Sequence, residues 1–346
     1  MSRRAGRLLL LLGSCLFLLA SCAFPGTVPE TVKLGLSAPF EGLYRDLGYE
    51  ALYAARLAVR QVNQAGGIGG GYLVELVALN DMNDAQEAAA QAVEMAVDVG
   101  ILGVIGGLSP RTATASAPEY ATRGLALVTP FAAPRYLGEL EANLAAGVLG
   151  AHTAAILHGA DAADLALAEG FSDAFAAQGG EVLLSACYAS DDDAANLLVE
   201  LAEEPDLLFV AAETSRAAAW IVALRAGGFG GTIFGGPEAA SALLVKLAGA
   251  ASEGVYAASP FGSGAMDSDF RSAYEALSGG VAPRGVAAWT YAAAQDLLGV
   301  MSSALEGGTD SARQRTEEAL KHRSADGSMA LYVVRGGQFL PATEGE

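Results

Sequence analysis

Residues 32–81 have the sequence VKLGLSAPFEGLYRDLGYEALYAARLAVRQVNQAGGIGGGYLVELVALND, in which two apolar runs are joined by an amphipathic stretch. The runs 32–38 and 72–79 have the length of buried strands. Between them, apolar residues recur at helical spacing, which predicts a helix over 48–64. A strand, a helix and a second strand in this order predict a parallel β-α-β unit.

The same alternation of elements continues through most of the chain. The first series goes on with helix 84–99, strand 101–106, helix 112–123 and strand 125–129. A second series comprises strands 153–157, 181–187, 206–212 and 231–235 and helices 163–178, 192–203 and 214–226. The chain ends with strand 254–259, helices 266–279, 285–304 and 310–323, and a hairpin turned on Gly336-Gly337. We therefore predict an α/β protein with two Rossmann-like lobes, each built on a parallel central sheet flanked by helices.

The N-terminus has the pattern of an export signal. Three arginines precede an apolar run that is shorter than the roughly 20 residues of a membrane-spanning helix, so a signal peptide is favoured over a transmembrane anchor. The run ends in Leu19-Ala20-Ser21-Cys22, which resembles the lipobox of bacterial lipoproteins. This resemblance implies cleavage after residue 21, acylation of Cys22 and a tether over 22–31. The alternative is an ordinary signal peptide with a chance cysteine.

Charge and cysteine content exclude several classes of protein. The chain has 20 Lys and Arg against 39 Asp and Glu, a net charge of −19. Removal of residues 1–21, with three Arg and no acid, would take this charge to −22. Such an acidic chain does not suit the phosphate backbone of nucleic acid, so we expect no nucleic-acid partner. The three cysteines are Cys15, Cys22 and Cys187, which leaves a single one in the mature domain and no disulfide framework.

Further sequence blocks follow one another in a fixed order. After residues 38–81 come VIGGLSPRTATASAPEYATRGLALVTP (104–130), FGGPE (234–238), AGAASEGVYAASPF (248–261) and AAWTYAAAQDLL (287–298). In this set and order the chain resembles the leucine/isoleucine/valine-binding branch of the periplasmic binding proteins. The resemblance implies the type I fold, with two lobes joined by three crossovers. It implies lobe 1 at 32–138 plus 260–325 and lobe 2 at 139–259 plus 326–346.

The loop after strand 101–106 is the first candidate ligand site. In open α/β sheets, ligands lie beyond the carboxyl ends of the strands, where helix N-termini offer free amides. The resemblance implies that this loop holds a ligand carboxylate, and here it offers Ser109, Arg111 and Thr112. Arg111 stands where the family usually has a hydroxyl residue. It could grip a carboxylate bidentately, or it could point into water from the cleft rim. Helix capping is the alternative role of Ser109 and Thr112.

Other candidates come from the next loop and from the start of the domain. The resemblance implies that Thr129, Phe131 and Ala132 meet the ligand's ammonium group or floor the pocket, although Phe131 could equally pack under the loop. It also implies an aromatic residue over the ligand near the start of the domain. Leu47 matches the register of that position better, and Tyr44 matches its chemistry better.

Lobe 2 supplies acidic candidates. Glu238 matches the acidic position that neutralises the ligand's ammonium in the family, and its alternative role is to cap a helix from about 239. Glu213-Thr214 replaces an aromatic pair, and residues 160–165 lack the usual tyrosine-glycine pair. The stretch 140–152 is also shorter than in the family. These departures predict a ligand other than leucine.

Several motifs that could suggest a nucleotide, metal or catalytic site lie in the wrong sequence context for that role. The run Gly66 to Gly71 follows a helix and precedes a strand, the reverse of a dinucleotide loop. The three histidines are scattered, and the acid run 191–193 suits a helix start better than calcium, so we expect no metal and no cofactor. Nothing has the arrangement of a catalytic nucleophile, so we expect no enzyme activity.

We therefore predict an exported, lipid-anchored solute-binding protein that acts as a monomer. It would close on a small polar ligand, such as an amino acid or a related amide or carboxylate, and present it to an ABC permease. The alternative is a sensor or orphan lipoprotein of the same fold that signals to a membrane partner.

Overall fold

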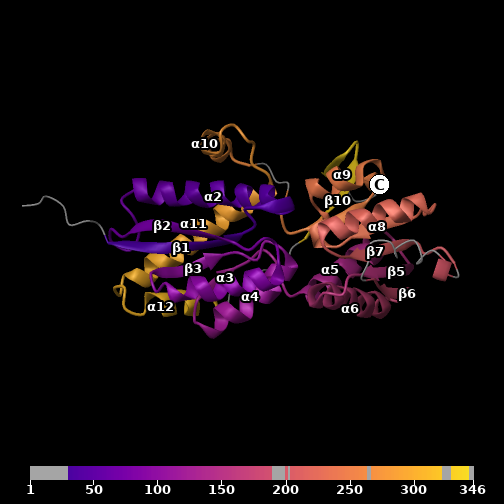
Figure 1. The fold of residues 1–346 in the computed structure, drawn as a ribbon, viewed down its shortest axis with the longest axis horizontal. Helices are drawn as coiled ribbons and strands as arrows, with labels where there is room; N and C mark the ends of the chain where they lie inside the picture. Colours follow the sequence, from indigo (N-terminus) through magenta and orange to yellow (C-terminus); the bar gives the residue numbers. More distant parts are fainter. Residues whose placement is uncertain (1–29, 189–198, 202, 263–265, 322–328, 343–346) are drawn as a thin grey trace, which may run out of the picture.

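The computed structural model describes residues 30–188, 199–201, 203–262, 266–321 and 329–342. The predicted signal peptide, Cys22 and the acid run 191–193 lie outside these residues. The molecule has two α/β lobes side by side along its longest axis (Figure 1). In the part of the chain that is described, no helix has the length and apolar character needed to cross a membrane.

The first lobe is built on a four-stranded parallel sheet in the order β2-β1-β3-β4. Its strands are β1 (Thr31–Ala38), β2 (Leu73–Asn80), β3 (Ile101–Ile105) and β4 (Ala126–Val128). Its helices are α2 (Arg45–Gln64), α3 (Ala85–Val97), α4 (Pro110–Thr122), α10 (Ser268–Ser278), α11 (Gly285–Leu305) and α12 (Ala312–Leu320), with the short helix η1 (Gly42–Tyr44) before α2. Helices α2 and α11 cover one face of the sheet, while α3 and α4 pack together on the other.

The second lobe is built on a seven-stranded sheet in the order β11-β10-β9-β8-β7-β5-β6. Its strands are β5 (Thr153–His158), β6 (Glu181–Cys187), β7 (Leu207–Ala211), β8 (Thr232–Gly235), β9 (Tyr256–Ser259), β10 (Ala330–Arg335) and β11 (Gln338–Pro341). Its helices are α5 (Pro134–Gly147), α6 (Ala162–Ala177), α8 (Thr214–Ala226) and α9 (Ala242–Ala248), with short helices η3 (Pro237–Ala239) and η4 (Gly249–Ser252). Strands β5 to β9 are parallel, whereas β10 runs antiparallel to β9 and β11.

The chain passes between the lobes three times, as predicted. It enters the second lobe between β4 and α5, returns between β9 and α10, and reaches the second sheet again between α12 and β10. The sequence did not predict α5, which packs along α6 and places Leu137, Ala142 and Ala145 in the same core as Phe171. The residue boundaries proposed for the lobes stay a prediction.

The hairpin at the C-terminus has the predicted turn. Strands β10 and β11 pair Arg335 with Gln338, so that Gly336 and Gly337 form the two-residue loop. Their φ angles are +58° and +75°, a left-handed conformation that a tight hairpin of this kind requires and that glycine adopts without strain. The alternating sequence before this turn therefore adds an edge to the second sheet.

Candidate functional site

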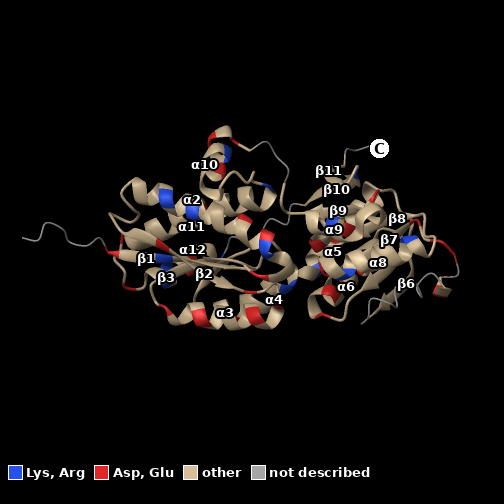
Figure 2. Ribbon diagram, turned by 45° about the horizontal axis from the view of Figure 1, so that its top comes forward, with Lys and Arg blue, Asp and Glu red and all other residues tan. Residues whose placement is uncertain are grey.

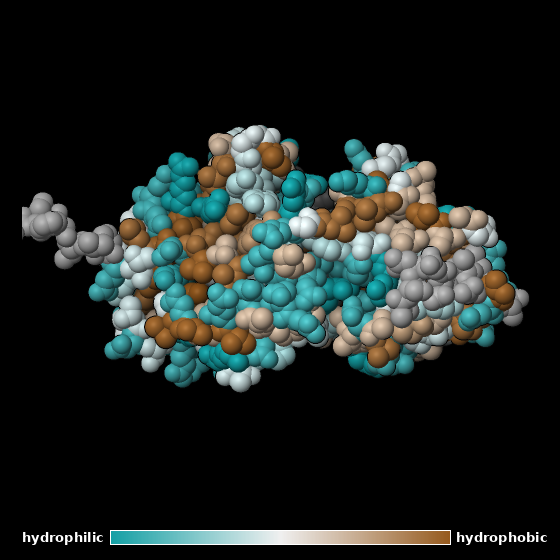
Figure 3. All heavy atoms as spheres, viewed as in Figure 1, coloured by the Kyte–Doolittle hydropathy of each residue, from teal (hydrophilic) through white to brown (hydrophobic). Residues whose placement is uncertain are grey.

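Loops from the carboxyl ends of both sheets meet where the lobes touch. Helix α4 follows β3 in the first lobe, and α6, α8 and η3 follow β5, β7 and β8 in the second. The N-terminal part of α4 packs near α6, and acidic and basic residues lie side by side at this junction (Figure 2). Hydrophilic residues cover the junction on the face seen in Figure 3. The site therefore lies where ligands are bound in open α/β folds.

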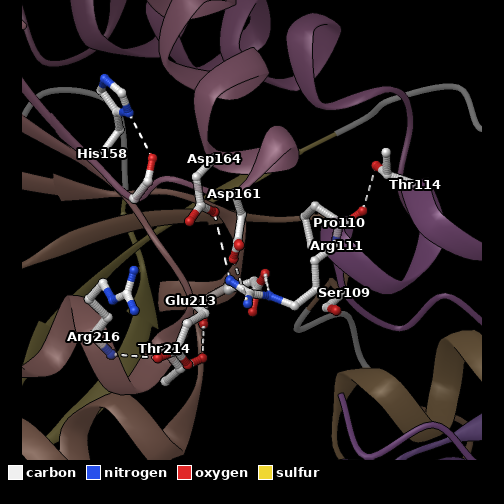
Figure 4. Close-up of polar contacts among 12 residues, drawn as sticks. Ser109, Pro110, Arg111, Thr114, His158, Asp161, Asp164, Glu213, Thr214 and Arg216 are labelled. Carbon is white, nitrogen blue, oxygen red and sulfur yellow. Dashed lines mark hydrogen bonds and ion pairs between the residues drawn. The ribbon is translucent and has the colours of Figure 1, made fainter. Parts of the chain in front are cut away.

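Arg111 of the first lobe is at the centre of this site. Ser109 is the N-cap of α4 and forms a capping box with Thr112, while Pro110 occupies the first helical turn. This rigid start fixes Arg111 at the positive end of the helix. The Arg111 side chain is only 14% exposed and reaches across to acidic residues of the second lobe (Figure 4). The alternative in which Arg111 points into water is therefore wrong.

Three carboxylates of the second lobe contact the Arg111 guanidinium. Its Nη1 donates to Asp161 Oδ2 at 2.9 Å, and its Nε donates to Glu238 Oε1 at 3.2 Å. Its Nη2 lies 3.8 Å from Asp164 Oδ1, which makes an ion pair without a hydrogen bond. Figure 4 shows Asp161 and Asp164 directed from α6 toward this guanidinium. The contacts tie the two lobes together through charged groups.

Burial shifts the pKa of two of these acids. Glu238 is buried, which raises the pKa of its carboxyl, although Arg111 and a hydrogen bond from Asn83 oppose this shift. Burial also raises the pKa of Asp164 from 3.8 to about 7, and Arg111 opposes this shift only in part. A carboxylate that leaves water without full compensation favours its protonated form. Carboxyl groups with a perturbed pKa are typical of functional sites, and these two lie in the interlobe seam formed by Arg111, Asp161, Asp164 and Glu238.

A second contact across the lobes joins Tyr44 and Glu213. Glu213 is the N-cap of α8 and accepts hydrogen bonds from the backbone N–H groups of Ser215 at 3.0 Å and Arg216 at 2.9 Å. The Tyr44 hydroxyl, in the first lobe, donates a hydrogen bond to Glu213 Oε2 in the second lobe. Burial would raise the pKa of Glu213, but the hydrogen bonds from Ser215 and Tyr44 outweigh it and lower the pKa. Glu213 is thus ionised, and both of its carboxylate oxygens already accept hydrogen bonds.

The structure brings some predicted site residues together and gives others supporting roles. Arg111, Glu238, Glu213 and Tyr44 meet across the lobes, whereas Leu47 packs against the first core. The remaining predicted residues serve local structure, with the following contacts. The hydroxyls of Ser109 and Thr112 cap α4; Thr129 Oγ1 donates to Gly107 O at 2.9 Å; Phe131 is buried against Phe261 in the second core, with Ala132 packed beside it.

Glu238 does not have its alternative role as a helix cap. In the part of the chain that is described, its side chain makes no capping bond in η3, and Ser241 caps α9 instead. The Thr214 hydroxyl donates to the Glu238 carbonyl at 2.7 Å, which fixes this turn against α8. The Glu238 carboxylate is therefore available to face the first lobe.

Sequence reasoning missed Asp161, Asp164 and Asn83 as parts of the site. The stretch 160–165 differed from the family pattern only by lacking an aromatic wall, and its two acids were not assigned a role. The available signal was that Asp161 and Asp164 lie at the start of the helix that follows a strand of the second sheet, the edge at which the other lobe carries an arginine. Within the described residues, no group of His, Cys, Asp and Glu has an arrangement that could hold a metal ion.

Two α/β lobes whose strand ends meet at a polar seam have the architecture of a protein that closes on a small ligand. The chain belongs to the periplasmic binding protein family, whose model matches residues 31–338. This confirms the family and the fold predicted from the sequence. The family consists of solute-binding proteins. None of the curated proteins matches the chain in sequence.

Solved structures share the fold over most of the chain. The leucine binding protein LivK from Thermotoga maritima is 20% identical with a TM-score of 0.75, covering 90% of this chain and 98% of its own. LivJ from Streptococcus pneumoniae, solved with isoleucine, is 20% identical with a TM-score of 0.71 and the same coverage of both chains. A solute binding protein from R. palustris, solved with benzoate, is 21% identical with a TM-score of 0.70, covering 90% of this chain and 95% of its own.

Proposed function

We propose that this protein captures a small polar solute between its lobes and delivers it to an ABC importer. The observation that carries the proposal is the polar seam in which Arg111 of one lobe meets Asp161, Asp164 and Glu238 of the other. Family membership supports a solute-binding role, and related structures were solved with isoleucine and with benzoate. The ligand would have to favour the closed arrangement of the lobes over the open one, because only differential affinity drives closure.

An amino-acid-like ligand suits the central pair of charges. Arg111 Nε and Glu238 Oε1 are 3.2 Å apart, so in this structure each residue neutralises the charge of the other. A zwitterion placed between them would give its carboxylate to Arg111 and its ammonium to Glu238. Both new pairs would lie in a site that loses water on closure, where charged hydrogen bonds are stronger.

A thermal-shift screen of amino acids, amides, carboxylates and short peptides tests the proposed function. Ligand present at about a hundred times its dissociation constant should stabilise the protein by about 2.7 kcal/mol. Glu238→Gln should weaken an amine-bearing ligand, and Arg111→Ala a carboxylate-bearing one, each by about tenfold or more. Asp173→Asn, which breaks an exposed pair with Arg135 outside the seam, is the matched control and should leave binding unchanged. Unchanged affinity in both seam variants would contradict the proposed site.

We also propose that Cys22, outside the described residues, anchors the protein as a monomer to the outer face of a membrane. In an expression host that processes lipoproteins, the wild-type chain should fractionate with membranes and be extracted by detergent. Cys22→Ser removes the thiol that would be acylated and should move the protein to the soluble fraction, because the chain then keeps no acyl group. The proposed lipid anchor would be contradicted if the variant stayed with the membranes, or if mass spectrometry found no lipid on the wild-type chain.

A further inference from the structure

The acidic side chains of the seam outnumber its basic side chain. Three carboxylates, from Asp161, Asp164 and Glu238, contact the single guanidinium of Arg111. Glu213 does not enter this balance, because its oxygens accept the first N–H groups of α8 and the Tyr44 hydroxyl. Asp164 and Glu238 have lost most of their water, whereas the Asp161 side chain is 52% exposed, so the cost of unequal charge falls mainly on the two buried acids.

Hydrogen bonds within the second lobe do not fully satisfy the carboxylates of Asp161 and Asp164. Asp161 is the N-cap of α6, yet within the described residues its side chain makes no capping bond. Asp164 is only 4% exposed, and its Oδ2 has no hydrogen-bond partner among the described residues. The positive end of α6 and the nearby Arg216 offset part of the charge. Even so, the pKa of Asp164 is raised to about 7, because burial, together with the neighbouring carboxylates of Glu238 and Asp161, outweighs both arginines.

The seam already binds a cation, namely the side chain of Arg111. Its guanidinium comes from the other lobe and is received by carboxylates on α6 and η3, as a ligand entering the cleft would be. Arg111 Nη2 remains without a hydrogen-bond partner among the described residues, so this occupant does not satisfy the cluster fully. The second lobe thus presents carboxylates that already surround a planar cationic group.

We propose that the ligand of this protein has a net positive charge, and that a guanidinium or amine group other than the α-ammonium of an amino acid enters the carboxylate cluster of Asp161, Asp164 and Glu238, where Arg111 now stands in for it. This inference rests on the proposed function and specifies its ligand class. A ligand that also has a carboxylate keeps Arg111 as its partner, whereas a ligand without one competes with Arg111 for the same acids.

Two ligand comparisons by titration calorimetry on the full mature chain test the charge of the ligand. Arginine and citrulline have the same amino-acid head and nearly the same shape, but citrulline replaces the guanidinium with a neutral urea. We expect arginine to bind at least about tenfold more tightly than citrulline or leucine. Agmatine, which has the guanidinium and no carboxylate, should also bind.

The Arg111→Ala variant tests whether Arg111 stands in for the ligand. Removing this competing like charge should strengthen agmatine binding by about tenfold, although the same change should weaken a ligand held by its carboxylate. Asp161→Asn should weaken agmatine binding, and Asp173→Asn, an exposed acid of α6 outside the seam, should not change it. The comparison of arginine with citrulline needs no variant and stands if Arg111→Ala fails to fold.

The outcomes separate the inference from the proposed function. Citrulline or leucine binding as tightly as arginine, or agmatine failing to bind, overturns the cationic ligand and leaves a solute-binding protein for neutral or zwitterionic ligands. Weaker agmatine binding by Arg111→Ala overturns the stand-in role. If none of the four compounds binds and the wider screen is also negative, the proposed function falls together with the inference.

Discussion

Replacing Glu141 with methionine is expected to stabilise the protein at neutral pH. Glu141 lies on α5 with 0% exposure, and neither of its carboxylate oxygens has a hydrogen-bond partner among the described residues. Burial therefore raises the pKa of this carboxyl well above its ordinary value. Methionine has a similar length and no polar group to desolvate. We expect a gain of about 1–3 kcal/mol in the free energy of unfolding, the usual cost of an unpaired buried polar group.

The gain should depend on pH in a defined direction. In the folded state the raised pKa keeps Glu141 protonated, while in the unfolded state the carboxyl ionises near its ordinary pKa of 4.5. Wild-type stability is therefore lost as pH rises above that value, so the advantage of Glu141→Met should grow from acid to neutral pH. Urea denaturation at several pH values measures it. Glu94→Met on α3, an exposed glutamate, is the control. A gain that does not change with pH would show that Glu141 is not held protonated.

The parallel sheets could be predicted because their strands are short, continuous apolar runs between helical patterns. Strands β3 (101–105) and β7 (207–211) are buried on both faces in the structure, and only a doubly covered sheet gives such a run. The C-terminal hairpin could be predicted from the pair Gly336-Gly337. Each of these signals is local, so no knowledge of the partner elements was needed.

Helix α5 could not be predicted because its stability comes from another helix. Its sequence contains two glycines and a buried glutamate, which are poor signals for an amphipathic helix. In the structure, a Cβ on Gly138 would lie 2.1 Å from the Leu167 carbonyl oxygen, and one on Gly170 of α6 would lie 2.0 Å from the Arg135 carbonyl oxygen. The two helices approach so closely that only glycine fits. This tertiary contact, rather than helix propensity, determines the element.

The chemistry of the candidate site was partly predictable and its pairing was not. Arg111 was selected because its loop follows a strand and matches the family's carboxylate-binding loop, and Glu238 because it matches the family's acidic position. Their contact depends on how the two lobes are placed, because Arg111 and Glu238 are 127 residues apart in the chain. The residues that the family pattern offered for ligand carboxylate, Ser109 and Thr112, cap the helix that presents Arg111. Local capping rules and a charge balance between the lobes thus complement the family pattern.

Replacing Asp164 with asparagine is expected to remove a pH-dependent loss of stability. The pKa of Asp164 is about 7 in the folded protein, above its value of 3.8 in the unfolded chain, and burial is the main cause. The folded state therefore holds the extra proton between these values, and stability falls as pH rises through this range. The full shift corresponds to at most about 4 kcal/mol. Because Arg111 and Glu238 are coupled to Asp164, we expect asparagine to recover about 2 kcal/mol above pH 7 and nothing near pH 4.

The difference in unfolding free energy between wild type and Asp164→Asn, measured at each pH, isolates this group, because the other titrating groups are common to both proteins. Asp173→Asn on the same helix should give a difference that does not change with pH, since Asp173 is exposed. A cationic ligand should reverse the order of stability at alkaline pH, because it repays the burial of Asp164 only in the wild-type protein. A difference that stays constant from pH 4 to 8 would mean that Asp164 is compensated in the ligand-free protein, and the cluster would then have no place for a further positive charge.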